Sequence, residues 1–272
     1  MTSGKIRTQT QVRRWAMFAL ACMAAALFLA GCSPSRMPAS QVPVSSISAS
    51  AKKPALSPLR IVLIQDKSLS TGETRTPQLT LDDMEPLVEL LGQHGGELAV
   101  GVISNRSNLS LARLRIDPGP QEPVAPPPSD NSLERWNQQN AWRKEQVDYQ
   151  SREQSWQQEM QQRVSDFQAA LEPILSMAPN AQHSPVWDAV RRANLFLSEP
   201  AVGGTPEPHR YALLITDGID DVGGKPISMH SGTRVLMVNG SGDLGSLAVL
   251  KPERFESIAA AVEYIVETES NH

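Results

Sequence analysis

A short aliphatic run followed at once by a carboxylate and two hydroxyls constrains this chain more than any other feature. Residues 61–64 read Ile-Val-Leu-Ile, the unbroken apolar pattern of a strand that is buried on both faces of a sheet. The run leads into Asp66, Ser68 and Ser70, an Asp-x-Ser-x-Ser pattern at the carboxyl end of that strand. Open α/β sheets bind ligands at this end of their strands. One carboxylate and two hydroxyls offer hard oxygen ligands, which suit Mg²⁺ or Ca²⁺ better than a soft metal.

Residues 1–31 predict a lipoprotein signal peptide. Four basic residues precede an apolar run of 16 residues at positions 15–30, shorter than the roughly 20 that a membrane-spanning helix needs. The run closes with Leu-Ala-Gly-Cys, which resembles the lipobox of bacterial lipoproteins. The resemblance implies cleavage before Cys32 and attachment of a diacylglycerol to its thiol. An ordinary cleaved signal with an incidental cysteine is the alternative.

Composition limits what the rest of the chain can be. Once residues 1–31 are removed, Cys32 is the only cysteine, so no intrachain disulfide can form. Residues 32–58 are rich in Ser, Ala and Pro without apolar periodicity, which predicts a disordered tether. Residues 61–272 hold 17 basic and 29 acidic side chains, a net charge of −12, which argues against nucleic acid as a partner.

Beyond the tether, apolar strands alternate with amphipathic helices. The expected elements are strands at 61–64, 98–103, 109–116, 211–216 and 234–238, with helices beginning near 80 and 185 and a closing helix at 255–266. Ser184 is placed to cap the helix that Pro185 opens. Strand–helix–strand units of this length are parallel and right-handed. We therefore expect an α/β fold: a doubly wound, mostly parallel open sheet with helices on both faces, formed by residues 59–117 and 160–269.

A helical insertion, residues 118–159, interrupts this domain. Residues 118–128 contain six prolines, which excludes a helix or central strand and predicts an exposed linker. Residues 132–172 lack proline and glycine and predict one long helix, which Pro173 must end or kink. We expect its later half to pack on the domain and its earlier half to lie outside the main core. Aromatic residues in the earlier half recur every seven positions, with Gln and charged residues between them: Trp142, Tyr149 and Trp156. The later half has an apolar stripe, interpreted as packing residues: Met160, Val164, Phe167 and Leu171.

Two further motifs follow the Asp66 pattern in the chain. Residues 183–189 read His-Ser-Pro-Val-Trp-Asp-Ala and place the Ser184 hydroxyl at the start of a helix. Residues 213–218 read Leu-Leu-Ile-Thr-Asp-Gly, so a second buried strand ends in a carboxylate, Asp217. The three motifs together resemble the von Willebrand factor A (VWA) domain with its metal-ion-dependent adhesion site.

This resemblance implies a role for each residue of the three motifs. Ser68, Ser70 and Ser184 would contact a divalent metal directly. Asp66 and Asp217 would act largely through water, and a carboxylate from a partner would complete the coordination. The family usually has Thr in place of Ser184, so the hydroxyl is kept while its rotamer is less restricted. Two further acids, Asp220 and Asp221, are expected to be solvated rather than ligating.

The leading expectation is a binding module without enzymatic activity. It would be a VWA-like lipoprotein anchored to the membrane through Cys32 and facing the periplasm, with Mg²⁺ as its cofactor and Mn²⁺ or Ca²⁺ as alternatives. Its partner would be a protein. A residue other than Asp after Cys32, here Ser33, implies sorting to the outer membrane.

Two other functions compete with this one. The first is a metal-free scaffold or envelope assembly protein that uses the helical insertion as its contact surface. The second is a nucleotide-dependent enzyme, because residues 240–245 match Gly-x-Gly-x-x-Gly after a strand. No acidic residue ends a following strand to bind a ribose, so we interpret that match as a surface loop. His183 lies beside Ser184, but no Gly-x-Ser-x-Gly turn accompanies them, so nucleophilic catalysis is not expected.

Overall fold

The computed structural model describes residues 56–105, 110–201, 206–238 and 244–271. The predicted signal peptide with Cys32, nearly all of the predicted tether and residues 240–243 of the glycine-rich loop lie outside these ranges. None of the helices within the described ranges is long and apolar enough to cross a membrane.

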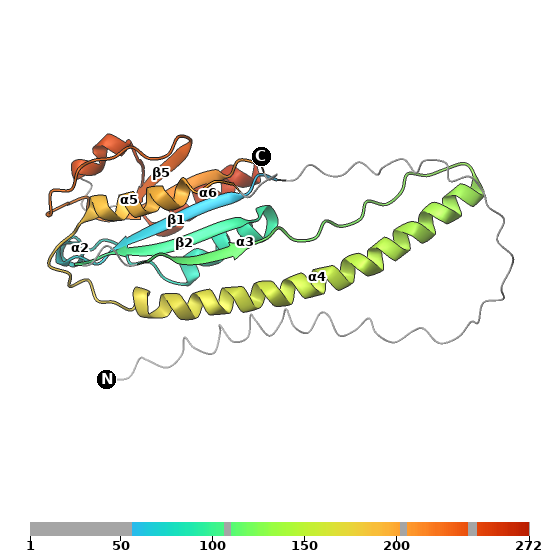
Figure 1. Cartoon of the computed structure of the whole chain (residues 1–272), viewed down its shortest axis with the longest axis horizontal. Helices are drawn as coiled ribbons and strands as arrows, with labels where there is room; N and C mark the ends of the chain where they lie inside the picture. Colours follow the sequence, from blue (N-terminus) through green and yellow to red (C-terminus); the bar gives the residue numbers. More distant parts are fainter. Residues whose placement is uncertain (1–55, 106–109, 202–205, 239–243, 272) are drawn as a thin grey trace. The chain divides into compact units, whose positions relative to one another are not determined.

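One six-stranded sheet, in the order β3-β2-β1-β4-β5-β6, lies at the centre of the fold (Figure 1). Its strands are β1 (Leu59–Asp66), β2 (Gly96–Ile103), β3 (Ala112–Ile116), β4 (His209–Ile215), β5 (Thr233–Val238) and β6 (Glu253–Phe255). Only the β2–β3 pair is antiparallel; the other four pairs are parallel. The predicted α/β fold with a mostly parallel sheet is therefore confirmed.

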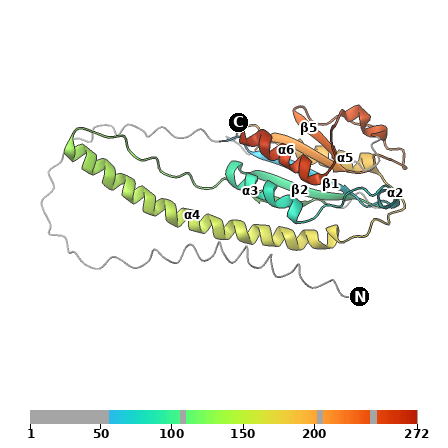
Figure 2. The same ribbon diagram turned by 180° about the vertical axis from the view of Figure 1, so that it is seen from behind.

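Helices cover both faces of this sheet, as the two opposite views show (Figures 1 and 2). Successive side chains of a strand point to opposite faces, so β1 contributes to two cores. Ile61 and Leu63 pack with α3 (Glu85–His94) and α6 (Ile258–Ser270), whereas Val62 and Ile64 pack with α5 (Val186–Leu197). All four side chains are fully buried, which explains why the run contains no polar residue.

Several elements differ from the prediction at their ends. A short helix, α2 (Leu69–Glu73), begins within the Asp-x-Ser-x-Ser pattern, and a 3-10 turn, η1 (Asp82–Met84), precedes α3. Phe255 belongs to β6 and not to the closing helix, which begins at Ile258. The Phe255 ring packs against Tyr264 of α6, with 5.2 Å between the ring centroids. Phe255 therefore contacts the closing helix without belonging to it. A second 3-10 turn, η2 (Gly245–Leu250), lies between β5 and β6.

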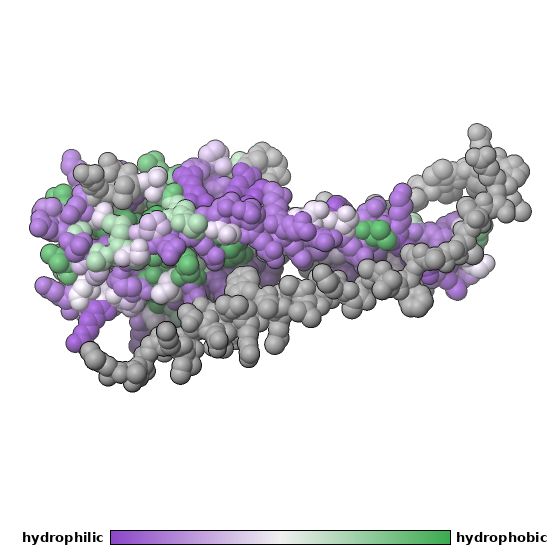
Figure 3. Space-filling model, turned by 90° about the horizontal axis from the view of Figure 1, so that it is seen from below, coloured by the Kyte–Doolittle hydropathy of each residue, from purple (hydrophilic) through white to green (hydrophobic). Residues whose placement is uncertain are grey.

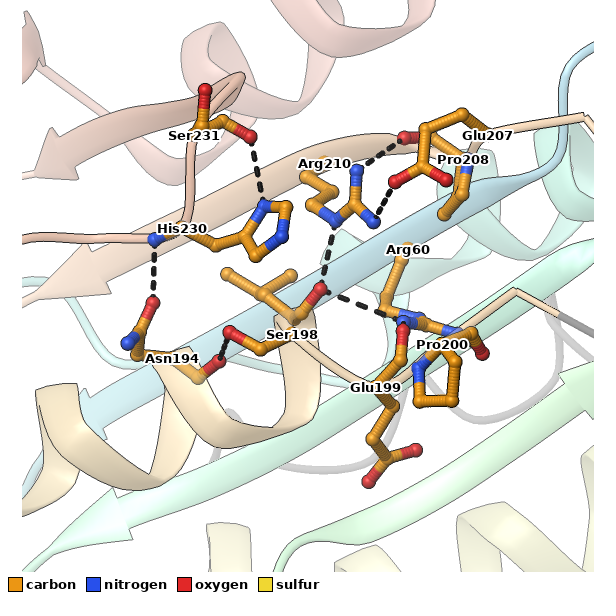
Figure 4. A network of polar contacts seen from close by, with 11 residues as sticks. Arg60, Asn194, Ser198, Glu199, Pro200, Glu207, Pro208, Arg210, His230 and Ser231 are labelled. Carbon is orange, nitrogen blue, oxygen red and sulfur yellow. Dashed lines mark hydrogen bonds and ion pairs between the residues drawn. The ribbon is translucent and has the colours of Figure 1, made fainter.

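Two buried arginines bind the carboxyl end of α5 (Figure 4). Arg60 and Arg210 are register partners at the amino ends of β1 and β4, and each is 7% exposed or less. Arg210 Nε donates to the Leu197 carbonyl at 2.7 Å, and Arg60 donates to the carbonyl of Glu199. The last carbonyls of a helix lack partners within it and carry partial negative charge, so two guanidinium groups stabilise this end.

A buried carboxylate fastens the last turn of α6 to β4. Glu269 is 2% exposed and accepts a hydrogen bond from the Tyr211 hydroxyl. Its second oxygen lies 2.7 Å from Nδ1 of His209. Burial and the neighbouring Glu269 raise the pKa of Tyr211 above its ordinary value.

The long helix α4 (Ser132–Leu175) has 44 residues and two different surroundings. In its later half, Phe167 and Leu171 are buried in the core beside α3, with Met160 and Val164 partly buried next to them. Pro173 lies within the last turn, and the helix ends two residues later. At the other end, the Asn131 side chain accepts hydrogen bonds from the first backbone amides and caps the helix.

The proline-rich segment packs along the earlier half of α4 instead of forming a free linker. Trp156 Nε1 donates to the Asp117 carbonyl at 2.9 Å, Trp142 Nε1 to Pro123 at 3.3 Å, and Arg135 Nε to Ser129 at 2.8 Å. Twelve residues of segment thus run antiparallel to 21 residues of helix, which is about 32 Å at the helical rise. The resulting ~2.6 Å per residue is far above a helical rise and near the 3.1 Å of polyproline II.

The same pairing explains the spacing of the aromatic residues. Every third residue of the segment is partly shielded, as a threefold polyproline helix requires: Pro120, Pro123, Pro126 and Ser129. Residues seven apart on an α-helix share a face, so the helix supplies a matching stripe. We refer to residues 117–156 as the hairpin.

We expect the domain to fold without the outer part of the hairpin. Replacing residues 121–152 by a four-residue Gly-Ser loop removes side chains that contact one another and retains Trp156, which packs against Gly92 and Gly119. The variant should keep a single cooperative thermal transition within a few degrees of the wild type. As a control, Phe167→Ala in the later half should lower the unfolding free energy by about 3 kcal/mol. Loss of the cooperative transition in the deletion variant would contradict this view.

Candidate metal site

All five predicted site residues meet at the carboxyl ends of β1 and β4. Parallel pairing of these two strands ends at Gln65 and Ile215, so Asp66 and Asp217 lie one and two residues beyond the last pair, at the same edge of the sheet. Asp66, Asp217, Ser68 and Ser184 are each 3% exposed or less. Ser70 lies in the first turn of α2 and is partly exposed.

Asp66 is the centre of the hydrogen bonds at this edge. Its Oδ1 accepts from the Ser68 amide at 2.9 Å. Its Oδ2 accepts from the Thr216 hydroxyl at 2.7 Å and from the Ser184 hydroxyl at 3.1 Å. Burial raises the pKa of the Asp66 carboxyl; the bonds from Thr216 and Ser68 lower it, and the charge of Asp217 raises it again. A cation beside this group would favour its ionised form.

Two of the three hydroxyls share a hydrogen bond whose length also matches the spacing of neighbouring ligands on a small cation. Ser68 Oγ and Ser70 Oγ lie 3.0 Å apart. Mg²⁺ holds oxygens at 2.0–2.1 Å in octahedral geometry, which separates neighbouring ligands by about 2.9 Å. Among the described residues no three His, Cys, Asp or Glu side chains gather at a metal-binding distance, so a cation here would depend on these hydroxyls. The donor set therefore fits a hard divalent cation.

The start of α5 differs from the prediction in a way that serves this cluster. Pro185, not Ser184, occupies the N-cap position, and the helix begins at Val186. The Ser184 side chain is thus available to bond Asp66 rather than a backbone amide. The prediction of Ser184 as the N-cap was wrong because a carboxylate 118 positions away competes for its hydroxyl.

Asp220 and Asp221 replace the missing cap. Asp220 Oδ1 accepts from the Val186 amide at 2.9 Å, and Asp221 Oδ1 accepts from the Ser184 amide at 2.6 Å. They were expected to be merely solvated, but unpaired amides at a helix N-terminus favour anions. Their effect is to hold the backbone that carries the Ser184 hydroxyl.

Sequence reasoning missed two residues of this region. Thr216 bonds Asp66, and the only signal for it was a hydroxyl at the last position of a buried strand. Lys67 is 2% exposed, and its Nζ donates to Gln78 Oε1 at 2.8 Å and to the Leu175 carbonyl at 2.9 Å. Burial lowers the pKa of this ammonium group. The position of Lys67 in the sequence, between Asp66 and Ser68, does not predict its contact with α4.

The glycine-rich match belongs to the edge of the same region. Gly245 has φ of +50°, and a Cβ there would lie 2.4 Å from the Gly218 carbonyl oxygen. Gly218 directly follows Asp217, so the loop approaches the site closely enough to require glycine. Residues 240–243 lie outside the described part of the chain, so the nucleotide-binding alternative stays a prediction.

Exposed apolar side chains flank the candidate site at the start of α2 and in the loop after β4. Leu69 follows Ser68 and is 51% exposed, while Ile219 and Val222 follow Asp217 and are 50% and 55% exposed. The space-filling view shows hydrophobic residues among hydrophilic ones on the domain, whereas the visible surface of the hairpin is mostly hydrophilic (Figure 3).

Comparison with known proteins adds little to this geometry. No protein-family model matches the chain. No curated protein matches it either. Among solved structures, proximal thread matrix protein 1 from the mussel byssus is similar to 78% of this chain, at 11% identity and a TM-score of 0.38. The match covers 48% of that protein, so the chain spans about half its length, and at this TM-score the likeness carries no functional argument.

Proposed function

We propose that this chain is a VWA-like module that binds a protein partner through a divalent cation, with Mg²⁺ as the first candidate and Mn²⁺ or Ca²⁺ as alternatives. One observation supports it above all: three hydroxyls and two buried carboxylates converge where β1 and β4 end, with Ser68 Oγ and Ser70 Oγ 3.0 Å apart. The fold places these groups where α/β sheets bind ligands.

Each group would have a distinct task. Ser68, Ser70 and Ser184 would supply neutral oxygens to the cation, and Asp66 and Asp217 would balance its charge. Neutral ligands leave the cation electrophilic, so a carboxylate of the partner would complete its coordination. Exposed aliphatic side chains beside the site would add apolar contact area around that carboxylate.

The proposal includes a lipid anchor at Cys32, an outer-membrane location and an orientation toward the periplasm. Its support is the sequence pattern before Cys32 and the serine after it. The module is proposed to act by binding alone, without catalysis.

Mg²⁺ or Mn²⁺ at millimolar concentration should raise the melting temperature of the chelator-treated protein. A ligand that binds only the folded state stabilises it by RT ln(1 + [L]/Kd), about 2.7 kcal/mol at a hundredfold excess over Kd. Ser70→Ala should lose much of this response, and Ser184→Thr should strengthen it. Differential scanning fluorimetry across a cation titration measures both effects.

Asp66→Ala separates binding from fold stability. It should abolish the cation response and also melt lower than the wild type without cation, because three donors lose their acceptor at about 1–3 kcal/mol for a buried unsatisfied group. Asp82→Ala, in the η1 turn, is the matched control and should keep the response. No shift of the wild type with any of the three cations would rule out the proposed function.

A metal-free scaffold remains the second candidate because α4 carries exposed apolar residues. Leu133, Trp136 and Val147 are each more than 60% exposed and lie on the helix face opposite the aromatic stripe. If cations have no effect, partner binding that is lost on deleting residues 121–152 would favour this function.

A further inference from the structure

A connection of eight residues, 176–183, joins α4 to Ser184, and the loop that begins at Asp66 holds it at both ends. At one end, Lys67 Nζ donates to the carbonyl of Leu175, the last residue of α4, at 2.9 Å. At the other end, the Ser184 hydroxyl donates to Asp66 at 3.1 Å. The end of α4 and one candidate ligand are therefore attached to adjacent residues of one loop.

The middle of the connection is attached to the same loop. Ala181 donates its amide to the Lys67 carbonyl at 3.0 Å and accepts from the Leu69 amide at 2.9 Å. These two bonds enclose Ser68, with which Ala181 forms an isolated parallel bridge. A shift of the Ser68 backbone would thus be passed directly to the connection.

We propose that cation binding at the candidate site and the docking of the last turn of α4 are coupled, with Lys67 as the positioning residue that links them. The inference rests on the proposed function. Neighbouring side chains of an extended chain point to opposite sides, so Asp66 faces the site while Lys67 faces α4. Coupling of this kind is reciprocal: a cation that fixes the loop tightens α4, and a loosened α4 weakens cation binding.

The chemistry of the Lys67 contact suits this role. Leu175 is the last residue of α4, so its carbonyl has no partner within the helix. A buried ammonium group at a helix carboxyl end is favoured by the partial negative charge there. Gln78 holds Lys67 Nζ from the other side at 2.8 Å, so the side chain has little freedom to follow another partner.

The test combines cation affinity with amide hydrogen exchange on the full chain. Lys67→Met keeps the length and apolar stem of the side chain but removes its three donors. We expect Mn²⁺ affinity, measured by calorimetry, to fall about tenfold, the lower range for loss of a residue that supports metal ligands. Lys144→Met, on the exposed surface of α4, is the matched control and should bind as the wild type does. In the wild type, Mn²⁺ or Mg²⁺ should slow exchange of the amides at 174–177 several-fold, and Lys67→Met should abolish that effect.

A second variant keeps the test informative if Lys67→Met does not fold. Gln78→Leu keeps Lys67 but removes the second partner of its Nζ; it should weaken Mn²⁺ binding less than Lys67→Met does and reduce the response of the amides at 174–177. Unchanged affinity in Lys67→Met, or an unchanged exchange response in either variant, would overturn the coupling while leaving the cation site intact. Absence of cation binding by the wild type would instead overturn the proposed function and the coupling together.

Discussion

Arg210→Met is expected to lower the free energy of unfolding by about 2–4 kcal/mol. The substitution removes the donors that bind the carbonyls of Leu197 and Pro208 at 2.7 and 3.1 Å (Figure 4). The Leu197 carbonyl then keeps only the 3.5 Å bond from Arg60, and a buried acceptor that loses its donor costs about 1–3 kcal/mol. The contact with Glu207 adds little, because that carboxylate is 68% exposed. Urea unfolding followed by circular dichroism measures the change.

Arg191→Met provides the matched control for this prediction. Arg191 also belongs to the α5 region, but it pairs with Asp188 on the surface, where both side chains are 45% exposed or more. Its loss should change stability by no more than about 0.5 kcal/mol. Equal effects of the two substitutions would show that the arginines do not cap α5. In the double variant with Arg60→Met the effects should be non-additive, because both arginines bond the Leu197 carbonyl.

Glu269→Leu is expected to destabilise the fold by a similar amount, about 2–4 kcal/mol. It leaves the Tyr211 hydroxyl buried without its acceptor and releases the last turn of α6 from β4. Glu269→Gln keeps an acceptor of the same shape and should cost less. If Glu269→Leu unfolds at the same urea concentration as Glu269→Gln, the hydrogen bond to Tyr211 contributes nothing.

The same cluster predicts a pH dependence with a definite sign. Burial, followed by the hydrogen bond and charge of Glu269, raises the pKa of Tyr211 in the folded state. The unfolded chain ionises this phenol near its ordinary value of about 10. Stability from this group is therefore full below about pH 10 and declines as the pH rises above it. Tyr211→Phe should lose that part of the decline, measured as unfolding free energy between pH 9 and 11.

The central strands could be predicted from the sequence because a strand buried on both faces appears there as an unbroken apolar run. Ile61, Leu63, Val62 and Ile64 divide between two cores, so no position in the run tolerates a polar side chain. The edge strand β6 has three residues, and its burial is only partial, so the sequence contains no apolar run that would predict it. The order of the strands also left no local signal, since it depends on pairings between distant segments.

The candidate site was predictable to the extent that its residues end strands. Asp66 and Asp217 follow apolar runs, and their meeting follows from parallel pairing alone. The supporting groups did not follow from any pattern. These groups act through hydrogen bonds to residues more than 30 positions away: Asp220, Asp221 and Thr216. No local sequence pattern indicates which distant residues will lie close together in space.

The pairing of the proline-rich segment with α4 has a consequence for how such a chain can change in length. The length of a helix that lies outside the core is not set by the core, but here each added heptad can be matched by three residues of the segment, the spacing between the Trp156–Asp117 and Trp142–Pro123 bonds. Insertions or deletions in these paired steps would preserve the aromatic contacts at Trp142 and Trp156 and leave the sheet untouched. The hairpin is thus a spacer of adjustable reach, and the distance between its tip and the domain can vary without altering the residues at the ends of β1 and β4.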